Sequence, residues 1–182
     1  MDRIIIITIT LMLCQTGCHA QALFDDVMQH APMASVFVLK ACDMDNDSSW
    51  KELALTAGAS YVLATATTYS LKQLVGERRP DGSDRRSFPS GHATYAFAGA
   101  TMLYHEYGHL SPWVAIGGLG VAALVSADRI RQDRHYLHDV CAGAAVGVLA
   151  TELAYLMKKK LVKSQNIDLS FTGQALLLAV RW

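Results

Sequence analysis

The sequence predicts an all-α protein, a helical bundle with a small β-hairpin near its C-terminal end. Long stretches rich in Ala, Leu, Thr and Gly alternate with short segments of Gly, Pro and charged residues, which is typical of helices joined by loops. Apolar residues make up 52% of the 182 residues and charged residues 18%, so one domain can bury a core. The net charge is zero, which argues against nucleic acid as a partner.

Residues 1–22 are interpreted as a signal peptide or N-terminal anchor. A charged start precedes an apolar stretch, Ile4 to Leu13, that is too short for an ordinary membrane span. Ala20-Gln21-Ala22 then has the small-x-small form of a cleavage site. We therefore expect an exported protein of the cell envelope, periplasmic or membrane-associated. Cys18, which follows a glycine, leaves a lipid anchor open.

The helical domain is expected to cover residues 23–163. After a short mixed lead-in over 23–47, Ser49 and Glu52 have the spacing of a capping box that begins a helix. This helix should end at about Glu77, because the residue before a nearby proline avoids helical geometry. Three further helices are expected at about Ser90–Tyr107, Pro112–Asp128 and Tyr136–Lys160.

Residues 164–182 form a predicted C-terminal extension of a different kind. Ile167–Phe171 and Ala175–Val180 flank Thr172-Gly173-Gln174, the pattern of a β-hairpin. Because an isolated hairpin is weak, we expect it to pack on the bundle.

Two stretches raise the question of a membrane. Leu53–Leu71 and Leu110–Ala127 carry no charge over 19 and 18 residues, close to the length of a span, although Thr, Ser and Gly dilute their hydropathy. Gly143 and Gly147 share one helix face and allow a second helix to approach closely. We expect membrane contact, and the sequence leaves integral or peripheral attachment and the oligomeric state open.

Three short segments carry candidate chemistry. In the first, Lys72 and Arg79 are seven residues apart, close to two helical turns, so we expect the two cations to share one helix face. Such a pair suits a phosphate, although a pair of exposed basic side chains would look the same.

The second segment is Pro-Ser-Gly-His, which ends at His92. Ser90 is a natural N-cap, Gly91 permits close approach of the backbone, and a helix N-terminus binds anions through its free N–H groups. An ordinary capped helix with an exposed histidine remains the alternative.

The third segment contains His135 and Asp139, four residues apart. Asp139 can hold one ring nitrogen of His135 and leave the other free as a nucleophile. Arg129 could fold back from before the loop as an anion clamp, whereas His138 lies off the face and is interpreted as a bystander.

Taken together, Lys-x6-Arg-Pro, Pro-Ser-Gly-His and Arg-x5-His-x3-Asp resemble the three-part signature of the type 2 phosphatidic acid phosphatase family. That family includes bacterial class A acid phosphatases and is related to vanadium haloperoxidases. The resemblance covers Lys72 to Asp139 and implies a helical bundle of this type, with no metal and no cofactor.

The resemblance also implies roles for eight residues. His135 would attack phosphorus and form a phosphohistidine, Asp139 would orient it, and His92 would protonate the leaving oxygen and then activate water. The phosphate oxygens would be held by Lys72, Arg79, Ser90, Gly91 and Arg129. Phosphoryl transfer depends on such positioning and charge stabilisation.

Two departures from the family pattern are visible. Asp128 stands where a serine is usual, which could weaken a phosphate contact or tune Arg129. The loop between the first two motifs is short, so Arg85 and Arg86 are expected to line the entrance as substrate contacts.

Two other patterns favour different chemistry. His105-Glu-Tyr-Gly-His109 matches a zinc protease motif, but Gly108 ends the helix that the motif needs and a third ligand is missing from the sequence pattern. Cys42 and Cys141 could form a disulfide after export, and the sequence leaves that pairing open.

The sequence therefore predicts a phosphatase that acts on a phosphate monoester or pyrophosphate, on a lipid or lipid-linked substrate in the cell envelope. A broad-specificity soluble periplasmic acid phosphatase acting on small phosphate esters is the enzymatic alternative. A phosphate- or lipid-binding module and a vanadate-dependent haloperoxidase are the others.

Overall fold

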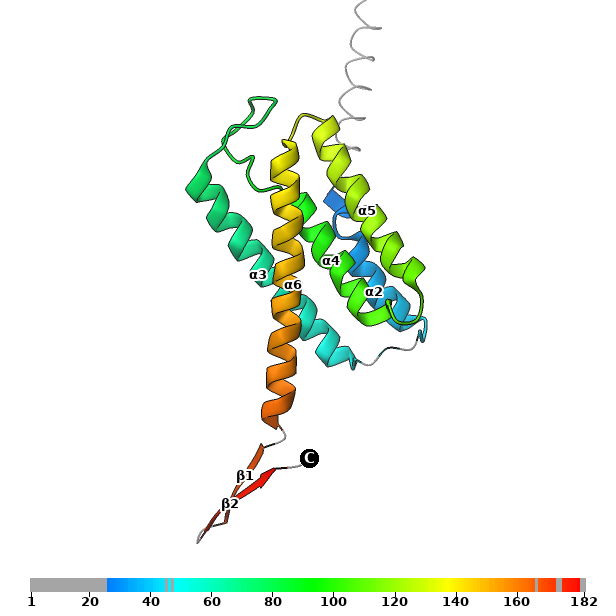
Figure 1. Cartoon of the computed structure of the whole chain (residues 1–182), viewed down its shortest axis with the longest axis vertical. Coiled ribbons are helices and arrows are strands. Elements are labelled where there is room, and N and C mark those ends of the chain that lie inside the picture. The colour runs from blue at the N-terminus through cyan, green and yellow to red at the C-terminus, as the bar shows by residue number, and fades with distance from the viewer. Residues whose placement is uncertain (1–25, 45, 47, 166, 173–174, 181–182) are drawn as a thin grey trace, which may run out of the picture.

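The computed structural model describes residues 26–44, 46, 48–165, 167–172 and 175–180. Within these ranges the chain forms the predicted helical bundle, followed by a two-stranded hairpin (Figure 1). The elements are α2 (Ala31–Ala41), α3 (Trp50–Val75), α4 (Gly91–Tyr107), α5 (Pro112–Arg131), α6 (Leu137–Gln165), β1 (Ile167–Thr172) and β2 (Ala175–Val180). The interpreted signal peptide, residues 1–22, and Cys18 lie outside the described residues.

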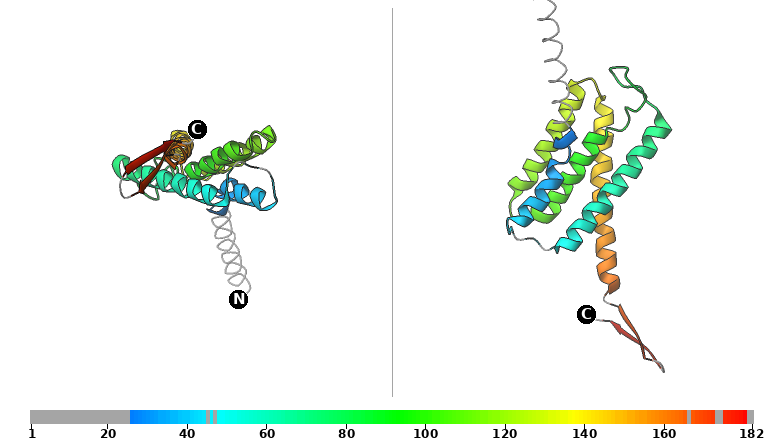
Figure 2. Two further views of the ribbon diagram at one scale, coloured as in Figure 1. Left: turned by 90° about the horizontal axis from the view of Figure 1, so that it is seen from below. Right: turned by 180° about the vertical axis from the view of Figure 1, so that it is seen from behind.

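Helix α4 is the central element of the bundle. It packs against α2, α3, α5 and α6, and α6 also packs against α3 (Figures 1 and 2). Most of its residues are buried, and many of these are Ala, Gly or Thr, so the neighbouring helices approach its backbone closely. One core cluster joins α2, α3 and α4 through Val36, Leu53, Met102 and Tyr107, and the Tyr107 hydroxyl donates to the carbonyl oxygen of Val36 at 3.1 Å.

The predicted close approach at Gly143 and Gly147 is confirmed. A Cβ atom at either position would lie under 3.0 Å from a backbone oxygen of α4 or its N-cap, that of Ser90 or Thr94 respectively. Only glycine allows this contact. It brings the first half of α6 against the beginning of α4, where two of the candidate motifs lie.

Helix α2 lies in the segment for which no helix is predicted. It has a proline in its first turn and buries Pro32, Met33 and Val36, but no side chain caps its N-terminus. Because the usual capping signal is missing and the helix is short, tertiary packing against α4 is the main reason it forms.

The end of α3 corrects the prediction for the first motif. The capping box at Ser49 and Glu52 is confirmed, but the helix ends at Val75, since Gly76 adopts a left-handed conformation with φ of 59°. Arg79 therefore lies in the loop and shares no helix face with Lys72.

The hairpin is confirmed in kind but not in its expected packing. β1 and β2 pair antiparallel, with Ile167 opposite Val180. Because α6 runs past the ends of its neighbours, the hairpin lies beyond the body of the bundle and not against it (Figures 1 and 2).

Helices α5 and α6 are, among the helices that the structure describes, the two long and apolar enough to cross a membrane. The predicted stretch Leu110–Ala127 largely coincides with α5, whereas Leu53–Leu71 lies in α3 and does not meet this standard. Many large apolar side chains are exposed along α5 and α6, among them Trp113, Ile116, Leu124, Leu149 and Leu153.

The structure gives the zinc-like motif another role. His105 Nε2 bonds Glu152 at 2.8 Å and stacks on Tyr155, and buried Glu106 accepts hydrogen bonds from Asn46, Ser48 and Tyr155. The helix ends at Tyr107, so His109 lies outside it. These residues form a polar network that joins helix ends, not a zinc protease site.

The two cysteines of the helical domain are not paired in the part of the chain that the structure describes. Cys42 and Cys141 are both exposed free thiols.

Candidate active site

The three motifs meet at one end of the bundle. The loop after α3, the N-terminus of α4, the loop between α5 and α6 and the first turn of α6 gather in the upper part of Figure 1. They come from parts of the chain up to about 65 residues apart and are held together by the packing of α6 on α4 and α3.

Asp139 is the structural centre of the site. It is fully buried in the first turn of α6, where its Oδ2 accepts hydrogen bonds from the Ser87 hydroxyl and from the backbone N–H of Tyr136 at 2.8 Å. Its backbone carbonyl accepts the N–H of Ser90 at 3.0 Å. Asp139 thus joins α6 to the loop that leads into α4. The Ser87 contact spans 52 residues, and no sequence signal indicates it.

His135 lies just before α6, and only 3% of it is exposed. Its Nδ1 is 3.6 Å from Asp139 Oδ2, so the predicted pair is brought together, although at more than hydrogen-bond distance. Within the described residues this Nδ1 makes no hydrogen bond. The spacing of four spans the loop and the first helical turn, not one turn of a continuous helix.

The surroundings of His135 keep its imidazole neutral. Burial, together with the positive charges of Arg79 and Lys72, lowers the pKa of His135 from 6.5 to about 4, although the Asp139 carboxylate opposes this shift. A neutral imidazole has a free lone pair at pH 7, which a nucleophile needs. Arg129 also lowers this pKa, so all three predicted cations lie near enough to act on the charge of His135.

Each of the predicted cations is held in place by the fold. Lys72 donates to the carbonyl oxygens of Arg86 and Pro89, both at 2.7 Å. Arg79 Nε bonds Asp84 Oδ1 at 2.8 Å. Arg129 is buried near the end of α5. The loop after α3 thus fixes Lys72 and Arg79 and is in turn fixed by them.

The N-terminus of α4 differs in detail from the predicted cap. Ser90 occupies the N-cap position, but its hydroxyl makes no capping bond, and this buried Oγ has no hydrogen-bond partner among the described residues. A Cβ atom at Gly91 would meet no described protein atom within 4 Å, so no neighbouring protein group requires glycine there. An unused hydroxyl beside a helix N-terminus suits an incoming anion.

His92 has a partner that the sequence does not indicate. Its Nε2 lies 3.0 Å from Asp26 Oδ1, a contact between α4 and the residues just before α2. Because α2 itself is not predicted, this carboxylate could not be placed from sequence.

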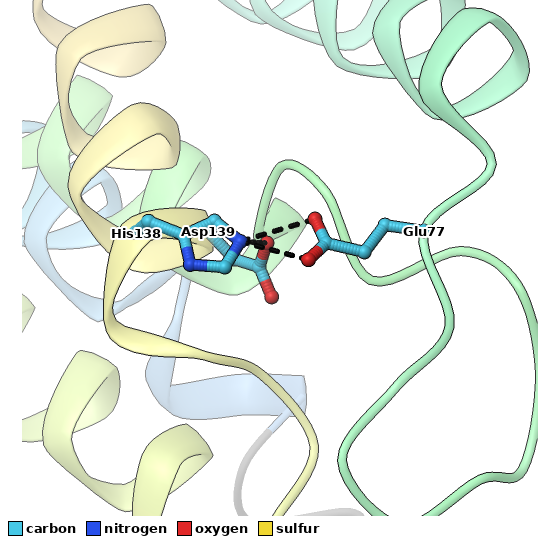
Figure 3. Close-up of side chains that lie close together, drawn as sticks. All are labelled: Glu77, His138 and Asp139. Carbon is cyan, nitrogen blue, oxygen red and sulfur yellow. Dashed lines mark hydrogen bonds and ion pairs between the residues drawn. The ribbon is translucent and has the colours of Figure 1, made fainter.

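His138 is more closely connected to the site than the interpretation as a bystander allows. Its Nε2 bonds Glu77 Oε1 and Oε2 at 2.9 and 3.1 Å and lies 3.2 Å from Asp139 Oδ1 without hydrogen-bond geometry (Figure 3). The hydrogen bond to Glu77 raises the pKa of His138. Each of these three residues offers one possible metal-ligand atom, and the three atoms lie within 4.8 Å of one another, which is the spacing of a possible cation site. The direct bond between His138 and Glu77 occupies that space.

The structure also describes the two features that depart from the family pattern, Asp128 and the short loop that carries Arg85 and Arg86. Asp128 accepts hydrogen bonds from Arg131 Nη2 at 2.7 Å and from Gln132. Arg85 and Arg86 are exposed in the loop before α4, where side chains can meet a ligand that enters from solvent or from a membrane surface.

The fold and this arrangement define the class of protein. Residues 53–163 match the PAP2 superfamily, and the chain belongs to that family, as the resemblance indicates. This range contains every predicted site residue.

Particular relatives are known by name. The chain is 36% identical over 132 residues to the lipid A 1-phosphatase of Porphyromonas gingivalis. The aligned region covers 72% of this chain and 30% of that protein. It is 35% identical over 81 residues to lipid phosphate phosphatase 1 of Arabidopsis thaliana, which covers 38% of this chain and 25% of that protein. The chain therefore spans less than a third of the length of these relatives.

One solved structure supports the fold. The crystal structure of Aquifex aeolicus LpxE matches with a TM-score of 0.58 at 21% identity, covering 74% of this chain and 84% of that one. The predicted bundle type is thereby confirmed.

Proposed function

We propose that the protein is a metal-independent phosphatase that hydrolyses a phosphate monoester or pyrophosphate on a lipid or lipid-linked substrate, through a phosphohistidine. The observation that carries the proposal is the buried imidazole of His135, which lies 3.6 Å from the Asp139 carboxylate and whose pKa is lowered by three nearby cations. This arrangement suits an attack on phosphorus because it combines a nucleophile with charge stabilisation for the phosphoryl group.

In the first step, His135 attacks phosphorus and the bond between phosphorus and the leaving oxygen breaks. Nδ1 faces Asp139, so Nε2 is the nitrogen available to form the new bond. The imidazole becomes positive as it is phosphorylated, and the Asp139 carboxylate stabilises that charge. His92 gives its proton to the leaving oxygen.

In the second step, water attacks the phosphohistidine and gives its proton to His92, which restores both histidines and releases phosphate. Lys72, Arg79 and Arg129 would hold the phosphate oxygens in both steps. The unused Ser90 hydroxyl and the Gly91 N–H would add uncharged donors.

A lipid-linked substrate is supported by the relatives, which carry the names of lipid phosphatases, and by the exposed apolar residues of α5 and α6. Two helices of spanning length support membrane attachment through the bundle itself. We place the site in the cell envelope on the strength of the N-terminal sequence pattern. The exposed apolar surface disfavours the alternative of a soluble acid phosphatase.

His135→Ala tests the proposal, with His109→Ala as the control because His109 is an exposed histidine at the other end of α4. We expect His135→Ala to lower phosphate release from a lipid phosphate by about 1000-fold or more, as loss of a nucleophile does. His109→Ala should match the parent, and a metal chelator should leave the parent unchanged. Near-normal turnover in His135→Ala, or loss of activity with chelator, would overturn the proposal.

A further inference from the structure

An apolar cleft of about 810 Å³ lies between α2 and α5. Its walls are hydrocarbon side chains and small residues, including Val38, Leu103, Trp113, Gly117 and Val121. Both helices pack on α4, and they contact each other at few points (Figure 2). Its size and apolar lining are those of a site for a hydrophobic ligand.

The cleft reaches the candidate active site at one end. Its polar lining residues include Asp26, His30 and Ser35, and Asp26 Oδ1 lies 3.0 Å from His92 Nε2. One wall of the cleft is therefore the direct partner of His92, the group that is proposed to protonate the leaving oxygen.

The chemistry of the proposed reaction indicates which part of the substrate lies on the His92 side of the site. The leaving oxygen carries the alcohol part of the substrate, and it must lie next to the acid that protonates it. The nucleophile attacks from the opposite side of phosphorus, since the attacking and leaving groups are roughly in line. The organic part of the substrate thus extends from the side of His92, which is where the cleft begins.

We propose that the cleft between α2 and α5 binds a hydrocarbon chain of the substrate lipid while its phosphate occupies the site around His135. This inference rests on the proposed function and adds where the lipid lies. It also accounts for the two adjacent glycines of α5. Gly118 packs closely on Leu103 and Ala100, whereas a Cβ atom at Gly117 would meet no described protein atom within 4 Å. Gly117 therefore widens the cleft and makes no close helix contact.

Gly117→Phe fills the cleft, and Gly120→Phe is the matched control. Both glycines lie on α5, are exposed and have open space at Cβ, but Gly120 does not line the cleft. Each variant gains the same helix propensity. Ala34→Phe, on the α2 wall, is a second variant that narrows the same space.

The assay uses three substrates. Two are phosphatidates in detergent micelles, one with long and one with short acyl chains, and the third is soluble p-nitrophenyl phosphate. We expect Gly117→Phe and Ala34→Phe to lower kcat/KM for the long-chain substrate by about tenfold, the effect of losing burial of a few methylene groups. Hydrolysis of p-nitrophenyl phosphate should be unchanged, and Gly120→Phe should match the parent on every substrate.

Three results separate the outcomes. If both cleft variants lower kcat/KM equally for all substrates, the cleft serves the catalytic geometry and the inference is wrong. If neither variant changes the dependence on chain length, another occupant, such as residues 1–25 or a second copy of the chain, fills the cleft and the inference is again wrong. If the parent hydrolyses no phosphate ester, the proposed function itself fails.

Discussion

At the scale of single residues, the site depends on groups whose properties come from their surroundings. Burial removes His135 and Asp139 from water, and three nearby cations lower the pKa of the histidine. The contacts of Ser87, Glu77 and Asp26 with the motif residues join positions 52 to 66 residues apart. Sequence spacing predicts contacts within a helix, so these tertiary partners lie beyond its reach.

The protonation of His135 gives a direct prediction. Because the pKa of His135 is lowered to about 4, its ring should stay neutral as the pH falls through 6.5. Between pH 6.5 and about 4 the unfolded chain binds a proton here that the folded chain does not, so this residue lowers stability as the pH falls through that window. Titration by nuclear magnetic resonance of the imidazole nitrogens measures the pKa.

A charge variant tests the cause of this shift. Arg79→Gln removes a cation that lowers the pKa of His135, so the pKa should rise. Arg78→Gln is the control, because Arg78 is an exposed neighbour in sequence that bonds Gly82. A parent His135 that titrates near 6.5, or equal shifts in both variants, would refute this description of the site.

At the scale of secondary structure, close packing of α6 on α4 positions the site. The predicted helices are largely confirmed because their capping, glycine and proline signals are local, as Ser49 and Glu52 illustrate. Helix α2 lacks such a signal, and the left-handed Gly76 ends α3 before Arg79. Helix α2 depends on tertiary packing and so was not predictable, whereas Gly76 is a local helix-end signal that the prediction passed over in favour of Pro80.

Gly147 provides the test at this scale. Gly147→Ala places a Cβ atom against the Thr94 carbonyl oxygen and should lower the free energy of unfolding by about 1–3 kcal/mol, the range for overpacking. Gly120→Ala, where the Cβ atom meets no described atom within 4 Å, should instead stabilise the helix by about 1 kcal/mol. Unfolding in denaturant measures both, and equal stability of the two variants would contradict the packing described here.

At the scale of the whole molecule, one end of the bundle holds the candidate site, and large apolar side chains are exposed on several helices. This division suits a protein that takes a charged headgroup from one side and hydrocarbon from another. The three motifs were sufficient to predict the family and the bundle, because their residues and spacing are specific. The position of the hairpin beyond α6 could not be predicted from the motifs, because it depends on the length of α6 relative to its neighbours.

The central claim is that His135 becomes covalently phosphorylated. The most direct measurement is mass spectrometry of peptides from the full chain, quenched under alkaline conditions during turnover of a lipid phosphate. His92→Ala should increase the trapped species if the release of the leaving group is less impaired than the attack of water. We predict one phosphoryl group on His135, absent from His135→Ala. Turnover with phosphate on another residue, or with no phosphorylated residue in the parent or in His92→Ala, would contradict the account.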